Sequence, residues 1–182
     1  MQIKWMTDEV GFRIIDIEYN DVNGGSIAVT VSKMNSKYTS CDEKISQALR
    51  YESGLLKDRS TYVAFRNAVS AHRSGLRTLL KDAKAKGKKV SGLGASTKGN
   101  VILQYCGLST DLISSIGEVN SQKFGCFTPG TWVPIVRETD VIADDPDYLL
   151  VLPWHFSKSF LERKGSFGRA NLIFPLPKLR IV

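Results

Sequence analysis

The residues best suited to chemistry lie in a glycine-rich stretch, residues 91–100, which reads Ser-Gly-Leu-Gly-Ala-Ser-Thr-Lys-Gly-Asn. The stretch follows a segment predicted to be a short strand and precedes a segment predicted to be a helix. A turn of small residues in this position exposes backbone N–H groups at the start of the helix, where a phosphate can bind. Lys98 adds a positive charge to the same turn. The stretch therefore predicts a phosphate-binding turn.

The glycine spacing fits the dinucleotide-binding pattern G-x-G-x-x-G only in part. Gly92 and Gly94 occupy its first two glycine positions, but Thr97 stands at the third and the next glycine is Gly99. A near-match of this kind is also typical of a tight turn that binds no ligand. That alternative stays open.

A carboxylate, Glu118, ends the next predicted strand along the chain. In a nucleotide-binding strand–helix–strand unit, a carboxylate at this place accepts hydrogen bonds from the ribose hydroxyls. The sequence therefore leaves two roles open for Glu118: a ribose contact, or an exposed glutamate in a loop.

Two further places combine aromatic or histidine side chains with turns. His155 follows a predicted strand, where it either contacts a ligand or serves the turn. Phe127 and Trp132 flank a Pro-Gly turn and either wall a base or sugar or pack in the core. The other histidine, His72, lies on the apolar face of a long predicted helix, where a structural role is expected.

The elements that must position these residues follow from hydrophobic periodicity. Residues 12–18 and 27–31 predict a β-hairpin. A helix is expected from residue 41 to residue 51 or 52, stopped by Gly54, and a second helix from 58 to 86. Strands are then expected at 90–93, within 112–119, and at 132–136, 148–152 and 171–174, and helices at 97–106, 137–143 and 157–164.

This alternation of strands and helices predicts an α/β fold, a Rossmann-like parallel sheet with helices on both faces. The N-terminal hairpin and the long helix precede it. Ligands of such sheets bind at the carboxyl ends of the strands, near the point where the strand order reverses. The glycine-rich turn, Glu118 and His155 all follow strand ends, so we expect them on one edge of the sheet.

Length and composition are those of an ordinary globular chain of 182 residues, 42% of them hydrophobic. No apolar run approaches the roughly 20 residues that span a membrane, and the N-terminus lacks the apolar core of a signal peptide. The three cysteines include no C-x-x-C pair, so neither a zinc site nor a disulfide framework is indicated. We therefore expect a cytoplasmic protein with no membrane partner.

The net charge of +7 is concentrated in one segment, because seven basic residues and one acidic residue lie between Arg73 and Lys89. Several recur at helical spacing and form a stripe, which either binds a polyanion or is a solvated helix face. No aromatic side chains interleave with the stripe, so stacking on bases is not indicated and no nucleic acid partner is expected.

A series of short motifs occurs in one order along the whole chain. The series reads Gly11-Phe12-Arg13, Gly24-Gly25-Ser26, residues 92–100, Tyr105-Cys106-Gly107, Glu118-x-Asn120-x-x-Lys123-x-Gly125, Pro129-Gly130-Thr131, Pro134-Ile135-Val136, Pro146-Asp147-Tyr148 and Leu152-Pro153-Trp154. This series resembles the C-terminal part of the S-adenosylmethionine-dependent sugar C-methyltransferases, which act on nucleotide-diphosphate sugars in deoxysugar biosynthesis.

The resemblance implies a domain organisation. Residues 1–39, hairpin and linker, resemble the end of a methyltransferase domain, and residues 40–182 resemble the Rossmann-like C-terminal domain. The family's zinc-binding cysteines, its methyl-donor turn and its Glu-His pair have no counterpart in this sequence. We therefore expect no catalytic residue, no metal site and no cofactor in this chain, with S-adenosylmethionine and zinc bound in upstream domains.

The resemblance also implies a substrate site for a nucleotide-diphosphate sugar. Two departures concern this site: Ala28 stands where a basic residue is frequent, and His155 where an asparagine is common. The implied contacts are Gly24, Gly25 and Ser26 on the sugar side, Gly94, Ser96 and Gly99 at the phosphate, Glu118 and Asn120 at hydroxyl groups, and the charges of Lys98 and Lys123. Gly92, Trp154 and His155 complete the implied substrate-binding residues.

The chain is thus expected to be the substrate-binding portion of a truncated or split C-methyltransferase. A separate methyltransferase-domain chain is a possible partner, and a homodimer through the hairpin is another, because a two-stranded hairpin cannot bury both of its faces. The alternatives are a stand-alone nucleotide-binding or regulatory module, and a polyanion-binding protein that uses the basic stripe.

Overall fold

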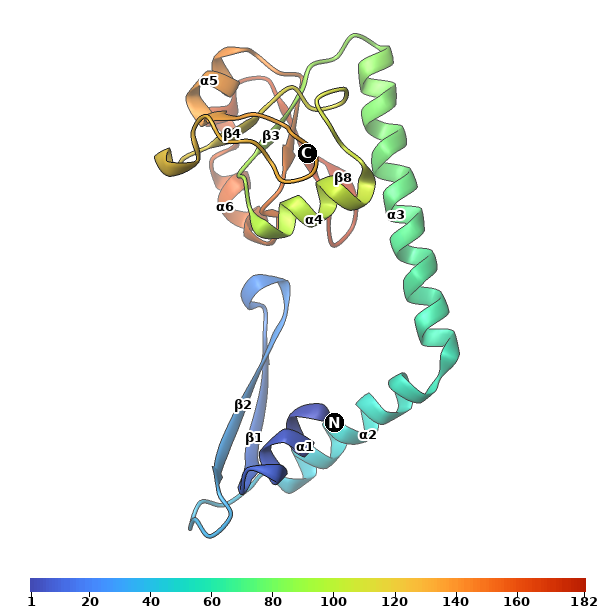
Figure 1. Cartoon of the computed structure of the whole chain (residues 1–182), viewed down its shortest axis with the longest axis vertical. Helices are drawn as coiled ribbons and strands as arrows, with labels where there is room; N and C mark the ends of the chain where they lie inside the picture. Colours follow the sequence, from blue (N-terminus) through green and yellow to red (C-terminus); the bar gives the residue numbers. More distant parts are fainter. The chain divides into compact units, whose positions relative to one another are not determined.

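The structure is a computed structural model that describes all residues from 1 to 182 (Figure 1). The chain forms two compact units, Met1–Asn67 and Ala68–Val182. The expected division at residues 39 and 40 concerns the boundary between family domains and stays a prediction.

The first unit is built on the expected hairpin. Strands β1 (Phe12–Asn20) and β2 (Ser26–Lys33) pair antiparallel and form a sheet of two strands. Helix α1 (Gln2–Glu9) precedes the hairpin, has no buried residue, and was not expected from the sequence. Helix α2 (Asp42–Lys57) packs against β1.

The expected end of α2 at Gly54 is wrong, because the helix continues to Lys57. The break falls at Asp58 instead, whose carboxylate accepts hydrogen bonds from the backbone N–H and the hydroxyl of Ser60. A side chain of this kind begins a new helix, whereas a glycine inside a helix only weakens it.

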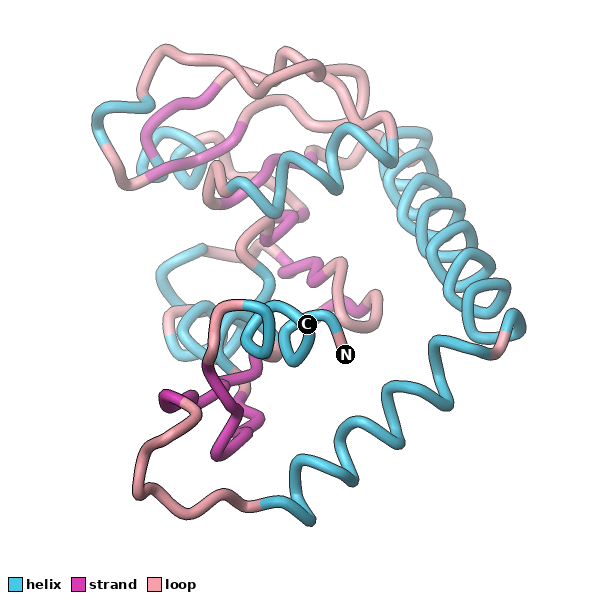
Figure 2. The backbone as a smooth tube through the Cα atoms, turned by 60° about the horizontal axis from the view of Figure 1, so that its bottom comes forward, coloured by secondary structure: helices cyan, strands magenta, loops and turns pink.

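Helix α3 (Arg59–Ala85) confirms the long helix expected after Asp58 (Figure 2). Its buried residues, Leu76, Leu80 and Ala83, lie only in its C-terminal half. Tyr62 and Phe65 recur at helical spacing on the same apolar face as Leu76 and Ala83, yet both are exposed. Apolar periodicity gave the face of the helix correctly only where a sheet lies against it.

The second unit confirms the Rossmann-like fold. Its sheet has the order β5-β4-β3-β6-β7-β8, in which the first five strands are parallel and β8 is antiparallel. The strand order reverses between β3 and β6, which is where such sheets bind ligands. The strands are β3 (Val90–Leu93), β4 (Ile116–Glu118), β5 (Ile135–Arg137), β6 (Tyr148–Val151), β7 (Asn171–Phe174) and β8 (Arg180–Ile181).

The strand expected at 132–136 begins three positions later, at Ile135. The preceding residues form a turn in which the Thr128 hydroxyl bonds the Thr131 hydroxyl at 2.7 Å and accepts the Val133 N–H at 2.9 Å. The turn uses backbone groups that a strand would have paired.

Helices cover both faces of the sheet. Successive residues of β6 belong to different cores: Leu150 packs with residues of α3 and α4 (Thr97–Cys106), and Leu149 packs with residues of α5 (Glu138–Ala143). Helix α6 (Ser157–Glu162) adds Phe160 to the second core. No helix of the structure combines the length and hydropathy needed to cross a membrane.

Candidate ligand-binding site

A cavity of about 310 Å³ lies at the carboxyl ends of β3, β4 and β6. We call it the carboxyl-edge cavity. Of the residues expected from the sequence, Gly94, Ser96, Glu118 and Lys123 line it. The cavity therefore lies where the strand order predicts a ligand, and it brings together the turn after β3 and the end of β4.

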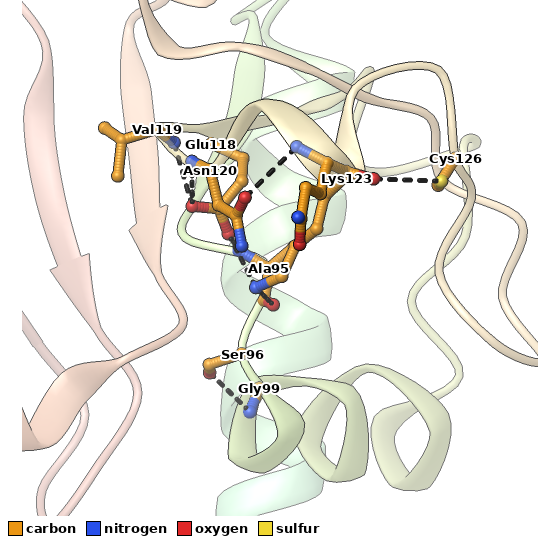
Figure 3. A network of polar contacts seen from close by, with 9 residues as sticks. Ala95, Ser96, Gly99, Glu118, Val119, Asn120, Lys123 and Cys126 are labelled. Carbon is orange, nitrogen blue, oxygen red and sulfur yellow. Dashed lines mark hydrogen bonds and ion pairs between the residues drawn. The ribbon is translucent and has the colours of Figure 1, made fainter.

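Glu118 is the centre of the polar network beside this cavity (Figure 3). Its Oε1 accepts hydrogen bonds from the N–H groups of Val119 (2.8 Å) and Asn120 (3.0 Å). Its Oε2 accepts from the N–H of Ala95 (2.9 Å) and from the ammonium of Lys123 (3.2 Å). The carboxylate thus ties the loop after β4 to the turn after β3.

The environment of Glu118 keeps it charged. Burial raises the pKa of its carboxyl, but the hydrogen bonds from Asn120, Val119 and Lys123 outweigh burial and hold the pKa below its usual value. A carboxylate offers about four acceptor positions, and four donors already occupy them. A ribose hydroxyl would have to replace one of these donors, so the ribose contact stays a prediction.

Lys123 and Asn120 also serve the loops themselves. The Lys123 ammonium donates to the carbonyl of Ala95 at 2.9 Å, and it keeps one further N–H for a ligand because an ammonium has three. The side-chain oxygen of Asn120 accepts the N–H of Gln122 and caps the short helix η2 (Ser121–Lys123). Both residues therefore stabilise the loops that form the expected site.

The backbone donors of the glycine-rich turn are largely engaged within the chain. The N–H of Gly94 donates to the carbonyl of Gly117, and the N–H of Ser96 donates to the carbonyl of Gly94. Ser96 caps α4 by accepting the N–H of Gly99 at 3.0 Å. The turn therefore offers fewer backbone donors than the sequence predicts. A phosphate bound there would depend more strongly on the ammonium of Lys98.

The glycines of this turn have packing reasons of their own. A Cβ on Gly92 would lie 2.9 Å from the side chain of Ile116, and one on Gly99 would lie 2.5 Å from that of Leu152. Gly94 has φ +74°, and its Cβ would meet Pro153 at 2.7 Å. The pattern that resembles a dinucleotide fingerprint is thus required by the close approach of β3 and α4 to their neighbours.

Lys98, Trp154 and His155 form a second polar group at the start of α4. The Lys98 ammonium lies over the indole ring at 5.8 Å, and the indole and imidazole rings are 5.5 Å apart. The indole Nε1 and the imidazole Nδ1 are buried without a hydrogen-bond partner. Such atoms call for a ligand or a water molecule.

The surroundings of His155 favour its neutral imidazole. Burial lowers its pKa, and the nearby charge of Lys98 lowers the pKa further. A neutral imidazole offers one donor and one acceptor, as the amide of an asparagine does. His155 can therefore make the polar contacts expected of an asparagine at this place.

The other expected positions lie outside the carboxyl-edge cavity. Gly24, Gly25 and Ser26 form the hairpin turn of the first unit, where both glycines have positive φ and the Ser26 hydroxyl donates to the carbonyl of Val22. Trp132 is 71% exposed, so the core-packing alternative for it is wrong. His72 has the expected structural role, because its Nε2 bonds the carbonyl of Pro175 at 2.8 Å.

The basic stripe is in part a structural device. The Arg77 guanidinium donates to the carbonyls of Cys106 (2.5 Å) and Gly107 (3.0 Å), at the C-terminus of α4. The Lys88 ammonium pairs with Asp147 at 3.0 Å. These contacts give Arg77 and Lys88 a role in the fold itself, and polyanion binding by the rest of the stripe stays an untested alternative. No group of three or more His, Cys, Asp or Glu side chains that could hold a metal ion occurs in the structure.

Sequence reasoning missed the far wall of the cavity. It is formed by Phe156, Phe160 and Arg163, from the segment after β6, and by Glu138 after β5. Arg163 forms an ion pair with Glu138. Glu138 and Phe156 lie shortly after predicted strands, and Phe160 and Arg163 lie in the helix expected at 157–164, but the sequence does not show that Arg163 pairs with Glu138.

Comparisons with known proteins assign the chain to a family. Residues 21–177 match the family model described as the C-methyltransferase C-terminal domain. The chain is 30% identical over 179 residues to the C-methyltransferase NovU of Streptomyces niveus, a match that covers 94% of this chain and 41% of that protein. The chain thus spans less than half the length of this curated relative. It belongs to the C-methyltransferase C-terminal domain family.

Proposed function

We propose that this chain is the sugar-nucleotide-binding portion of an S-adenosylmethionine-dependent sugar C-methyltransferase. The observation that carries the proposal is the carboxyl-edge cavity at the reversal of the strand order, in a chain of this family. Its polar residues Ser96 and Lys123 and its aromatic residues Phe156 and Phe160 suit a ligand that joins a charged group to a ring.

In the complete enzyme, substrate binding and the chemical step use residues from different parts of the polypeptide. A base removes a proton next to the keto group of the sugar, and the resulting carbanion attacks the methyl group of S-adenosylmethionine. We assign to this chain the binding of the nucleotide and its phosphates, with Lys98 as the cation at the start of α4. The base and the methyl donor are supplied from outside this chain.

The proposal predicts that nucleoside-diphosphate sugars bind the chain and that S-adenosylmethionine does not. Isothermal titration with UDP-glucose and dTDP-glucose should give saturable binding, and Lys98→Ala should weaken it about 10- to 100-fold, the value of a charge-assisted hydrogen bond. Lys178→Ala removes an exposed lysine elsewhere and serves as the control. Binding of S-adenosylmethionine alone, or equal affinities of the two variants, would contradict the assignment.

We also propose that the first unit is a partner-binding surface, occupied in the isolated chain by a second copy. Its hairpin is a sheet of two strands, and both outer edges lack a strand partner. Ile17 and Ile45 are its only buried hydrophobic residues, whereas Tyr19 is 70% exposed and Trp5 61%. Exposed edges and apolar side chains favour pairing with another chain.

This surface predicts a dimer at tens of micromolar. Ile27→Lys, on the exposed part of β2, should convert the chain to a monomer in light scattering. Val101→Lys places the same charge on an exposed residue of α4 and should leave the dimer intact. A monomeric wild-type chain would refute self-association and leave a separate methyltransferase-domain chain as the proposed partner.

A further inference from the structure

The carboxyl-edge cavity has two cationic side chains, and they differ in the donors they can offer a ligand. Lys123 spends two of its three N–H groups on Ala95 and Glu118. Arg163 has five N–H donors in a planar fork, and Glu138 accepts from one of its nitrogens, Nη2. Arg163 therefore carries the larger free donor capacity in the cavity.

The guanidinium of Arg163 is held in place from two sides. Glu138 forms an ion pair with it, and the Cζ atom of Arg163 lies 5.3 Å from the centroid of the buried Phe167 ring. The Glu138 side chain is 13% exposed and that of Arg163 is 47% exposed. The pair is thus anchored at the carboxylate and open at the guanidinium, so a ligand meets a cation whose orientation is already set.

An aromatic wall stands beside this cation. Phe156 and Phe160 line the same cavity, and Phe160 stacks on Phe167 with 6.2 Å between ring centroids. A planar ring can lie against this wall while an acidic group attached to it reaches the guanidinium fork. The combination fits a nucleotide.

We propose that Arg163 binds a phosphate group of the nucleotide in the carboxyl-edge cavity and that Glu138 is the positioning residue that orients it. The inference rests on the proposed function, and it names a phosphate ligand that the sequence motifs did not include. The alternative is an ion pair that only joins the segment after β5 to the segment after α6, and such partly exposed pairs contribute little to stability.

Isothermal titration with UDP, dTDP, uridine and thymidine distinguishes a phosphate-binding Arg163 from an ion pair that is only structural. We expect Arg163→Ala to weaken the diphosphates about 10- to 100-fold and the uncharged nucleosides less than about threefold. Arg163→Lys keeps the charge but loses the fork, so its affinity for the diphosphates should lie between those of wild type and Arg163→Ala. Glu138→Gln should also weaken only the diphosphates, because it loosens the guanidinium.

Arg169→Ala is the matched control, since Arg169 pairs with Asp145 at 2.9 Å, is similarly exposed and does not line the cavity. It should bind the diphosphates as the wild type does. Equal affinities of Arg163→Ala, Arg163→Lys and Arg169→Ala, with the wild type still binding, would overturn this inference and leave the proposed function intact. A wild-type chain that binds none of the four probes would overturn both.

Discussion

Replacing Gly99 by alanine should lower the free energy of unfolding by about 3 kcal/mol, the upper part of the range for an overpacked core. The added Cβ would lie 2.5 Å from the Cβ of Leu152 and 3.0 Å from the hydroxyl of Ser96. Leu152 is fully buried and cannot move aside without disturbing the core. Because Ser96 caps α4 through the Gly99 N–H, the first turn of α4 should loosen as well.

Gly54→Ala is the control for this substitution. Gly54 also lies inside a helix, α2, but a Cβ there meets nothing within 4 Å. Alanine should therefore stabilise α2 by up to about 1 kcal/mol, the difference in helix propensity. Urea unfolding followed by circular dichroism measures both variants. A Gly99→Ala variant as stable as the wild type would mean that Leu152, the residue after β6, and α4 are not packed as closely as the structure has them.

These two glycines also show where sequence reasoning succeeds and where it stops. The strands and helices between residues 90 and 174 could be predicted, because buried apolar runs alternate with turns at short spacing. The sequence predicts a helix end at Gly54, since nothing local distinguishes a glycine that a helix tolerates from one that ends it. A glycine is needed at residue 99 because Leu152 leaves no room for a Cβ, and only the folded chain shows that the two residues are close.

Elements with little hydrophobic pattern of their own were missed. Helix α1 has no buried residue, so no apolar period marks its face. Strand β8 is two residues long, and it exists because β7 offers it an edge. In both cases tertiary contacts decide the structure, and such contacts leave no local trace in the sequence.

The candidate site also contains residues that could be predicted from the sequence and residues that could not. The carboxyl ends of β3 and β4 could be located, so Gly94, Ser96, Glu118 and Lys123 were expected together, and they line one cavity. The ion pair of Arg163 could not be expected, because its partner comes from a segment that only the sheet order brings near. The four donors on Glu118 were equally invisible.

Replacing Glu118 by alanine should lower the free energy of unfolding by about 3 kcal/mol, although the carboxylate is charged and lies in a candidate binding site. The substitution leaves the N–H groups of Ala95, Val119 and Asn120 without their acceptor. The hydrogen bond from Ala95 is buried and the other two are partly buried, and a buried donor left unpaired costs about 1–3 kcal/mol. Water can reach part of the opening, since the Lys123 side chain is 41% exposed, so the penalties do not add in full.

The loss of stability caused by Glu118→Ala should depend on pH. Because hydrogen bonds hold the pKa of Glu118 in the folded state below its usual value of 4.5, the unfolded chain binds the extra proton first as the pH falls. The stability contributed by Glu118 is therefore fully present above pH 4.5 and is lost as the pH falls through the lowered pKa. The difference in stability between wild type and Glu118→Ala should shrink over that range.

Urea unfolding at pH 7 and at intervals below pH 5 measures this difference. Glu162→Ala serves as the control, because Glu162 is an exposed glutamate of α6 and its loss should change stability by less than about 0.5 kcal/mol at any pH. If Glu118→Ala behaved like Glu162→Ala, the carboxylate would not tie the two loops together. Its acceptor positions would then be available to a ribose, as the sequence alone suggested.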